Sequence, residues 1–275
     1  MNHSIVFPKI WLALTVPIVI LLAAAAGGGV FINGLYRDVP YFAAQAKGQD
    51  LVSLVIVLPT LIFTARLASR NSPRAGLIWL GALIYLVYTY AIAAFVVRFN
   101  PMFLVYVALF GCSLYALIGG LSTANTAVIQ ACFAEKTPTK AVSIYLAVLV
   151  VLFYVLWLSE ILPALIAGTI PKSIQDNGTP TNAVHVLDMA WILPACGITI
   201  FSLWRKKALG YTLAGAILSY CVLLILAILG MVVSMAQNGQ PIVLPQVLVF
   251  GVLFVISLGI LILYMKGLRS SNVAE

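Results

Sequence analysis

The chain has 275 residues, of which 63% are hydrophobic and only 8% are charged, and its formal net charge is +8. Soluble domains carry a charge on about a quarter of their residues, so this composition excludes a soluble globular protein and indicates an integral membrane protein. The basic residues are scattered through short loops and form no patch, which argues against nucleic acid as a partner, and no P-loop or dinucleotide fingerprint occurs.

Eight stretches of the chain are apolar and reach the length of about 20 residues that a helix needs to cross a bilayer. The first exceeds the roughly 7–15 apolar residues of a signal peptide, so we expect it to be a spanning helix. The predicted fold is therefore an all-α integral membrane protein with about eight transmembrane helices, in a single domain over residues 1–275. In chain order the predicted spans are 10–32, 50–68, 75–97, 101–121, 141–168, 186–204, 209–236 and 245–265.

The basic residues of the loops predict the orientation in the membrane. When the N-terminus is placed in the cytoplasm, only four of the fifteen Lys and Arg residues face outward, namely Arg37, Lys47, Arg98 and Lys172. Because cytoplasmic loops are enriched in Lys and Arg, we expect a cell-membrane protein with both termini in the cytoplasm.

The two halves of the chain resemble each other in places. PMFLVYVALFGCSL (101–114) and PQVLVFGVLFVISL (245–258) are identical at seven of fourteen positions. Pro59 and Pro194 each lie nine residues after a polar residue near a predicted helix start, Asp50 and His185 respectively. These similarities raise the hypothesis of two parallel four-helix repeats, residues 1–121 and 141–265, joined by a cytoplasmic loop at 122–140. Asp50 and His185 would then occupy equivalent positions that face each other.

Polar residues inside the predicted spans are candidates for function, because a charge buried in lipid costs about 2.5–3.5 kcal/mol on insertion scales. We expect a pocket near the outer leaflet that binds a small molecule or ion. Arg98 should lie within salt-bridge or water-bridged reach of Asp50, Asp188 or Glu160. His185 should line the same cavity. The candidate residues are Gln49, Asp50, Tyr88, Arg98, Asn100, Glu160, His185 and Asp188.

Several of the candidates also have a structural interpretation. Asp50 at a helix start would be an ordinary N-cap, and Arg98 would extend to the lipid headgroups. Tyr88 and Tyr90 would belong to an interfacial aromatic belt. If His185 and Asp188, one turn later, form a working site, His185 would titrate near neutral pH. If they do not, the pair only marks the end of a helix. The sequence leaves these alternatives open.

Metal and cofactor chemistry have little support in the sequence. A single intramembrane histidine cannot supply a multi-histidine iron or zinc centre or a bis-histidine haem, and the four cysteines form no C-x-x-C pair. We therefore expect neither a metal nor a cofactor. Gly111-Cys112-Ser113 has part of an intramembrane serine protease motif, but Leu114 stands where a glycine should follow.

Three segments, GQDLVSLVIVLP, VVRFNP and HVLDMAWILP, resemble in this order an uncharacterised family of prokaryotic multi-pass membrane proteins. The resemblance implies the same topology and marks the same polar positions, but it implies no activity. The function that we expect first is small-solute or ion transport. The alternatives are a membrane-embedded sensor or accessory subunit that binds a ligand or partner, and, less favoured, an intramembrane enzyme that acts on a lipid or isoprenoid.

Overall fold

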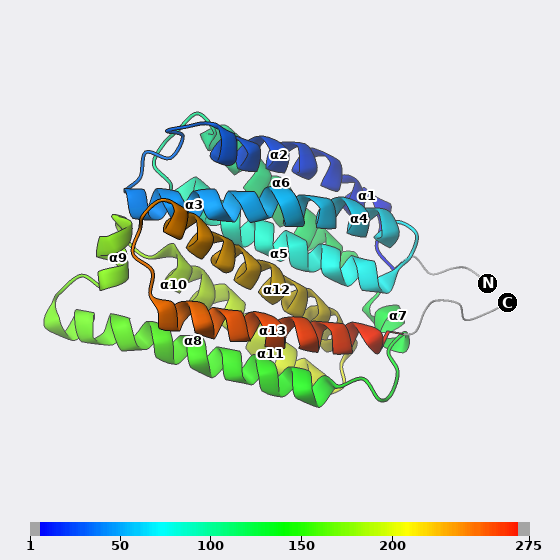
Figure 1. Cartoon of the computed structure of the whole chain (residues 1–275). Coiled ribbons are helices and arrows are strands. Elements are labelled where there is room, and N and C mark those ends of the chain that lie inside the picture. Colours follow the sequence, from blue (N-terminus) through cyan, green and yellow to red (C-terminus); the bar gives the residue numbers. More distant parts are fainter. Residues whose placement is uncertain (1–5, 269–275) are drawn as a thin grey trace.

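The structure is a computed structural model that describes residues 6–268, and most of that range is helical (Figure 1). It contains eight helical spans that are long and apolar enough to cross a membrane. The protein is therefore an all-α multi-pass membrane protein whose helices contact the lipid bilayer. The spans are Lys9–Phe31, Pro40–Ala68, Pro73–Phe95, Phe103–Thr123, Thr139–Ala167, Ala183–Trp204, Ala208–Gln237 and Leu244–Lys266.

Three of these spans consist of shorter pieces, and the other five are single helices. The first span consists of α1 (Lys9–Ala13) and α2 (Thr15–Phe31). The second consists of α3 (Pro40–Val52), the π-helix η1 (Ser53–Val57) and α4 (Leu58–Ala68). The sixth consists of α10 (Ala183–Leu187), the π-helix η2 (Asp188–Ile192) and α11 (Leu193–Trp204). The single helices are α5 (Pro73–Phe95), α6 (Phe103–Thr123), α8 (Thr139–Ala167), α12 (Ala208–Gln237) and α13 (Leu244–Lys266), and the short helices α7 (Thr126–Ala131) and α9 (Lys172–Asn177) lie in connections.

The eight predicted spans are confirmed, but the second one begins at Pro40 and not at residue 50. Residues 40–49 are too polar to count as lipid-spanning sequence, yet Pro40 starts a helix well, because its missing N–H falls in the first turn. Asp50 therefore lies within a helix, where it is buried. Its interpretation as an N-cap is wrong.

The second and sixth spans contain the same irregularity. Each has a five-residue π-helix followed by an α-helix with proline at its second position, Pro59 in α4 and Pro194 in α11. Proline lacks an N–H and clashes with the carbonyl of the preceding turn, and a π-helical turn accommodates that break. Ser53 opens η1 and Asp188 opens η2, and these two residues are 135 positions apart in the sequence. Pro59 and Pro194 are separated by the same 135 positions. The repeat hypothesis itself stays a prediction.

Helices α5 and α12 pack against each other through the middle of the bundle (Figure 1). Small residues allow this approach: a Cβ at Gly81 of α5 would overlap Ser219 of α12, and such residues let helix backbones come close in membrane proteins. Tyr85, Tyr88 and Tyr90 are buried within α5. The interpretation of Tyr88 and Tyr90 as interfacial belt residues is therefore wrong.

The bundle has two ends, which we name after the short helices that lie there (Figure 1). The α7 end is joined by hydrogen bonds between distant segments: Arg74 donates to the carbonyls of Met265 and Leu268, and Gln130 donates to that of Lys206. The α9 end carries the loop before α3, the turn before α6 and the segment between α8 and α10. The candidate residues lie in this half of the molecule.

Candidate functional site

Asp50 is the polar centre of a first site. It lies on α3 with 5% of its surface exposed, and its carboxylate accepts a hydrogen bond from the Tyr36 hydroxyl. Burial, followed by the nearby Asp50 carboxylate, raises the pKa of the Tyr36 phenol above its ordinary value. Tyr36 therefore stays a proton donor to Asp50. Gly29 on α2 makes room for this pair, because a Cβ there would overlap the carboxylate and lie against the hydroxyl.

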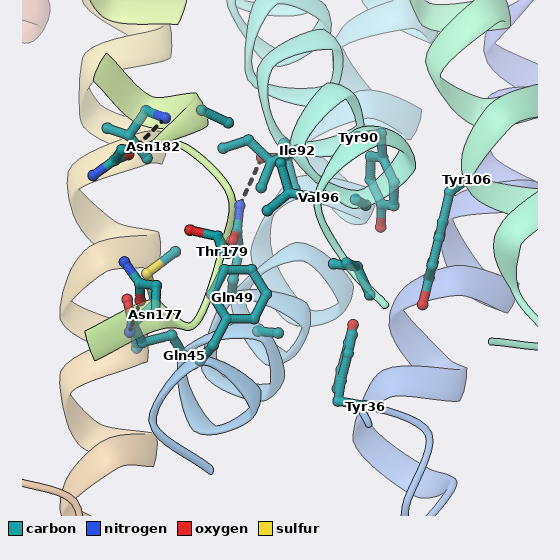
Figure 2. Close-up of a pocket in the computed structure, with 18 of the residues that line it drawn as sticks. Tyr36, Gln45, Gln49, Tyr90, Ile92, Val96, Tyr106, Asn177, Thr179 and Asn182 are labelled. Atoms are coloured by element: carbon teal, nitrogen blue, oxygen red, sulfur yellow. Dashed lines mark hydrogen bonds between the residues drawn. The ribbon is translucent and has the colours of Figure 1, made fainter. Parts of the chain in front are cut away.

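A cavity of about 120 Å³ lies beside Asp50, between α3, α5, α12 and the segment that joins α9 to α10. Figure 2 shows the hydroxyl groups of Tyr36, Tyr90 and Tyr106 directed toward the same part of this cavity. The hydroxyls of Tyr90 and Tyr106 are buried and have no hydrogen-bond partner among the described residues. Because a buried polar group without a partner costs about 1–3 kcal/mol, these hydroxyls are suited to a polar group that enters the cavity.

Asp188 is the centre of a second site. It opens η2, is 7% exposed, and accepts hydrogen bonds from the Tyr88 hydroxyl at 3.0 Å and from the Trp157 indole nitrogen at 2.9 Å. Across residues 6–268, neither Asp188 nor Asp50 forms an ion pair. Both carboxyl groups are thus buried with neutral donors as their hydrogen-bond partners.

A second cavity, of about 230 Å³, lies beside Asp188 between α5, α8, α12 and α13. Gln45 and Gln49 of α3 line both cavities. The Gln49 side chain donates to the Thr89 hydroxyl at 2.8 Å (Figure 2). The two carboxyl groups therefore lie in neighbouring cavities that share an amide-bearing wall.

His185 and Glu160 form a separate pair. The imidazole Nε2 lies 3.6 Å from the Glu160 carboxylate, which also accepts the Ser173 backbone N–H at 2.7 Å. The imidazole ring lies against the Trp157 indole, with ring centroids 4.5 Å apart. His185 is buried but lines neither of the two cavities, so the expectation that it lines the site cavity is wrong. Its position beside Trp157 supports a residue that does line the Asp188 cavity.

Arg98 lies outside the site. Its side chain is exposed and donates to the Arg37 carbonyl at 3.3 Å, while its backbone N–H donates to Asp38 at 3.1 Å. The predicted salt bridge to Asp50, Asp188 or Glu160 is not formed, because the loop before α3 holds the turn between α5 and α6 through these contacts.

Asn100, two residues after Arg98, is buried, but it lines neither cavity. Its side-chain oxygen accepts the Met102 backbone N–H at 2.9 Å, just before α6 begins. Among the described residues this is a turn-stabilising contact, of the kind that asparagine side chains make with the backbone two residues on.

Several residues of the two sites were not found by sequence reasoning. Tyr36 lies in a loop, and Trp157 and Phe153 lie on α8, whose sequence is apolar on all sides and gives no sign of which face turns inward. Tyr220 carries one usable signal, because it follows Tyr85 by 135 positions, the same spacing that separates Ser53 from Asp188.

No family model, curated protein or solved structure matches the chain. The chemistry of the two cavities is therefore the basis for its functional assignment.

Proposed function

We propose that the protein is a transporter that couples the movement of a small solute across the cell membrane to the movement of protons, and that Asp50 and Asp188 bind and release those protons. The observation that carries this proposal is the pair of buried carboxyl groups without ion pairs, in adjoining cavities within the spanning helices. A carboxyl group at this depth is stable when it holds a proton or faces a cation. Each site is therefore suited to change its charge as solute enters and leaves.

The helix breaks beside these sites support the same proposal. Asp50 lies one turn before η1, and Asp188 opens η2. Interrupted helices at the binding site are a recurring feature of secondary transporters built from internal repeats, and π-helical turns are frequent at functional sites. Under the repeat hypothesis, the second and sixth spans would be equivalent elements that move relative to the rest of the bundle.

We propose further that the α7 end faces the cytoplasm. Many Lys and Arg residues lie at or near this end, namely Arg66, Arg70, Arg74, Lys136, Lys140, Arg205, Lys206, Lys207 and Lys266. The excess of Lys and Arg in short cytoplasmic loops supports this orientation.

A second candidate function, an intramembrane enzyme that acts on a lipid, is favoured by one observation. A largely apolar groove of about 650 Å³ runs between α5, α6 and α10, and it shares Val96, Thr181 and Ala183 with the Asp50 cavity. A lipid chain in this groove would bring its polar end near Asp50. Transport is the better supported function, since His185, whose imidazole could serve such an enzyme as acid or base, lines neither site cavity.

Transport can be tested in liposomes that contain the full chain and a pH-sensitive dye. Glycine, glucose, lactate and choline are added one at a time, with protein-free liposomes as the background. We expect at least one solute to drive a change of the internal pH, and we expect Asp50→Asn and Asp188→Asn to reduce the rate to that background. Asp176→Asn removes an exposed carboxylate that pairs with Lys172, so this control should retain the full rate. If no solute moves protons through the wild-type protein, the proposal is overturned.

A further inference from the structure

We propose that the cavity beside Asp188 binds a small organic cation, an amine or a quaternary ammonium ion. The inference deepens the proposed function and rests on it in one respect, namely that the bound cation is the solute that is moved. Three features of the cavity carry it: its aromatic walls, its single negative charge and a buried hydroxyl without a partner.

The walls of the cavity are aromatic on several sides, and its volume of about 230 Å³ far exceeds the roughly 30 Å³ that one water molecule occupies in the liquid. Phe153 and Trp157 on α8 lie with ring centroids 5.9 Å apart. Tyr88 and Tyr220, from α5 and α12, form a second tilted pair at 5.8 Å, and Phe250 of α13 completes the set. Ring faces attract cations within about 6 Å of the centroid, and such aromatic cages recognise quaternary ammonium ions.

The charge of the lining has one sign. Asp188 is the only carboxyl group among the lining residues, which include no Lys, Arg or His. The Tyr88 hydroxyl and the Trp157 indole N–H hold its two oxygens in place but carry no positive charge. An anionic solute would be repelled by an ionised Asp188, and a neutral one would leave its charge uncompensated. A cation would compensate it.

One residue of the cavity wall, independently of Asp188, carries a buried hydroxyl without a partner. The Tyr220 side chain is 1% exposed, lines the cavity, and has a hydroxyl group with no hydrogen-bond partner among the described residues. A phenol hydroxyl can accept an N–H of an amine or accept from the hydroxyl of a choline-like ligand. The exposed Gln246 at the start of α13 also lines the cavity.

The test compares choline with 3,3-dimethylbutan-1-ol, which has the same shape but a neutral carbon in place of the nitrogen. Binding to the purified full chain in detergent is measured by calorimetry, with tetramethylammonium as a second cation. We expect both cations to bind, and we expect the neutral alcohol to bind at least about tenfold more weakly than choline. Asp188→Asn should remove this preference.

Two phenylalanine variants form a matched pair for the aromatic part of the site. Phe153→Leu should weaken choline binding more than binding of the neutral alcohol, because it removes a ring face but keeps an apolar side chain. Phe63→Leu makes the same change at a residue that is 65% exposed on α4, and it should leave binding unchanged. If neither cation binds the wild-type protein, or if the neutral alcohol binds as well as choline, the inference is overturned.

The failure of the inference can be told apart from the failure of the proposed function. Charge-selective binding that depends on Asp188, in a protein that moves no protons with any solute, would overturn transport and leave the cation site standing. Proton movement driven by glycine, glucose or lactate, with no preference for the cations, would overturn the cation site and leave transport standing.

Discussion

Asp50 and Asp188 are both buried carboxyl groups, but their neighbours differ. Asp50 accepts from the Tyr36 phenol and lies beside further tyrosines in a small cavity. Asp188 accepts from a phenol and an indole and lies in a larger cavity whose walls are mostly aromatic or apolar. Under the proposed function both carboxyl groups exchange protons, and the larger aromatic cavity gives Asp188 room for a bulkier cation as well.

At the residue scale, Gly29→Ala tests whether the position of Asp50 matters. The new Cβ would overlap the Asp50 carboxylate, so either the carboxylate or α2 must shift. We expect a destabilisation of about 1–3 kcal/mol and a loss of proton-coupled transport. Unfolding is followed on heating by the reaction of the buried Cys196 and Cys221 thiols with a maleimide dye. Gly27→Ala, on the same helix but with no atom near the new Cβ, should leave both properties intact.

At the scale of the helices, the central contacts depend on close backbone approach. Gly48 of α3 faces Gly230 of α12, and α3 and α12 pack closely. The residues 135 positions away, Ala183 and Phe95, instead line the apolar groove between α5, α6 and α10. Under the repeat hypothesis, a bulky ring where the other half has glycine would explain why one side of the bundle is closed and the other is open.

We therefore expect Gly48→Ala to separate α3 from α12. A Cβ at this position would overlap the backbone of Gly230 and Met231, and overpacking of this kind costs about 1–3 kcal/mol. The measurement is the unfolding temperature in detergent, which should fall.

Gly251→Ala on α13 is the matched control, since nothing lies near its new Cβ. Alanine favours a helix over glycine by about 1 kcal/mol, so this variant should unfold at the same temperature as the wild type or higher. If both variants behave alike, the α3–α12 contact is not as close as the structure has it.

At the scale of the whole molecule, the two ends differ in their basic residues, and this difference predicts the orientation. Ser69→Cys lies at the α7 end and Thr169→Cys at the α9 end, and both positions are exposed. In a protein whose Cys112 and Cys132 are replaced by serine, a membrane-impermeant maleimide added to intact cells should label Thr169→Cys at once. Ser69→Cys should react only after the membrane is opened. The reverse pattern would overturn the orientation.

Much of this architecture could be predicted from the sequence, because bilayer thickness ties a span to a local run of apolar residues. The spans were predicted to within about three residues at each end, apart from the polar start of the second. The same reasoning placed Asp50 and Asp188 among the site candidates, since ionisable residues within apolar runs need no long-range information to be noticed.

Only the tertiary structure decided which side chains meet. Helices such as α8 are apolar on all sides, so their sequence does not say which face turns inward, and the contact of Trp157 with Asp188 could not be predicted. Arg98 was expected to lie within reach of a buried carboxylate, but the fold of the loop before α3 offers it Asp38 and the Arg37 carbonyl at the surface. The sequence by itself determined how often the chain crosses the membrane and which carboxyl groups lie within it. The packing of the helices determined that aromatic rings, and no arginine, surround those groups.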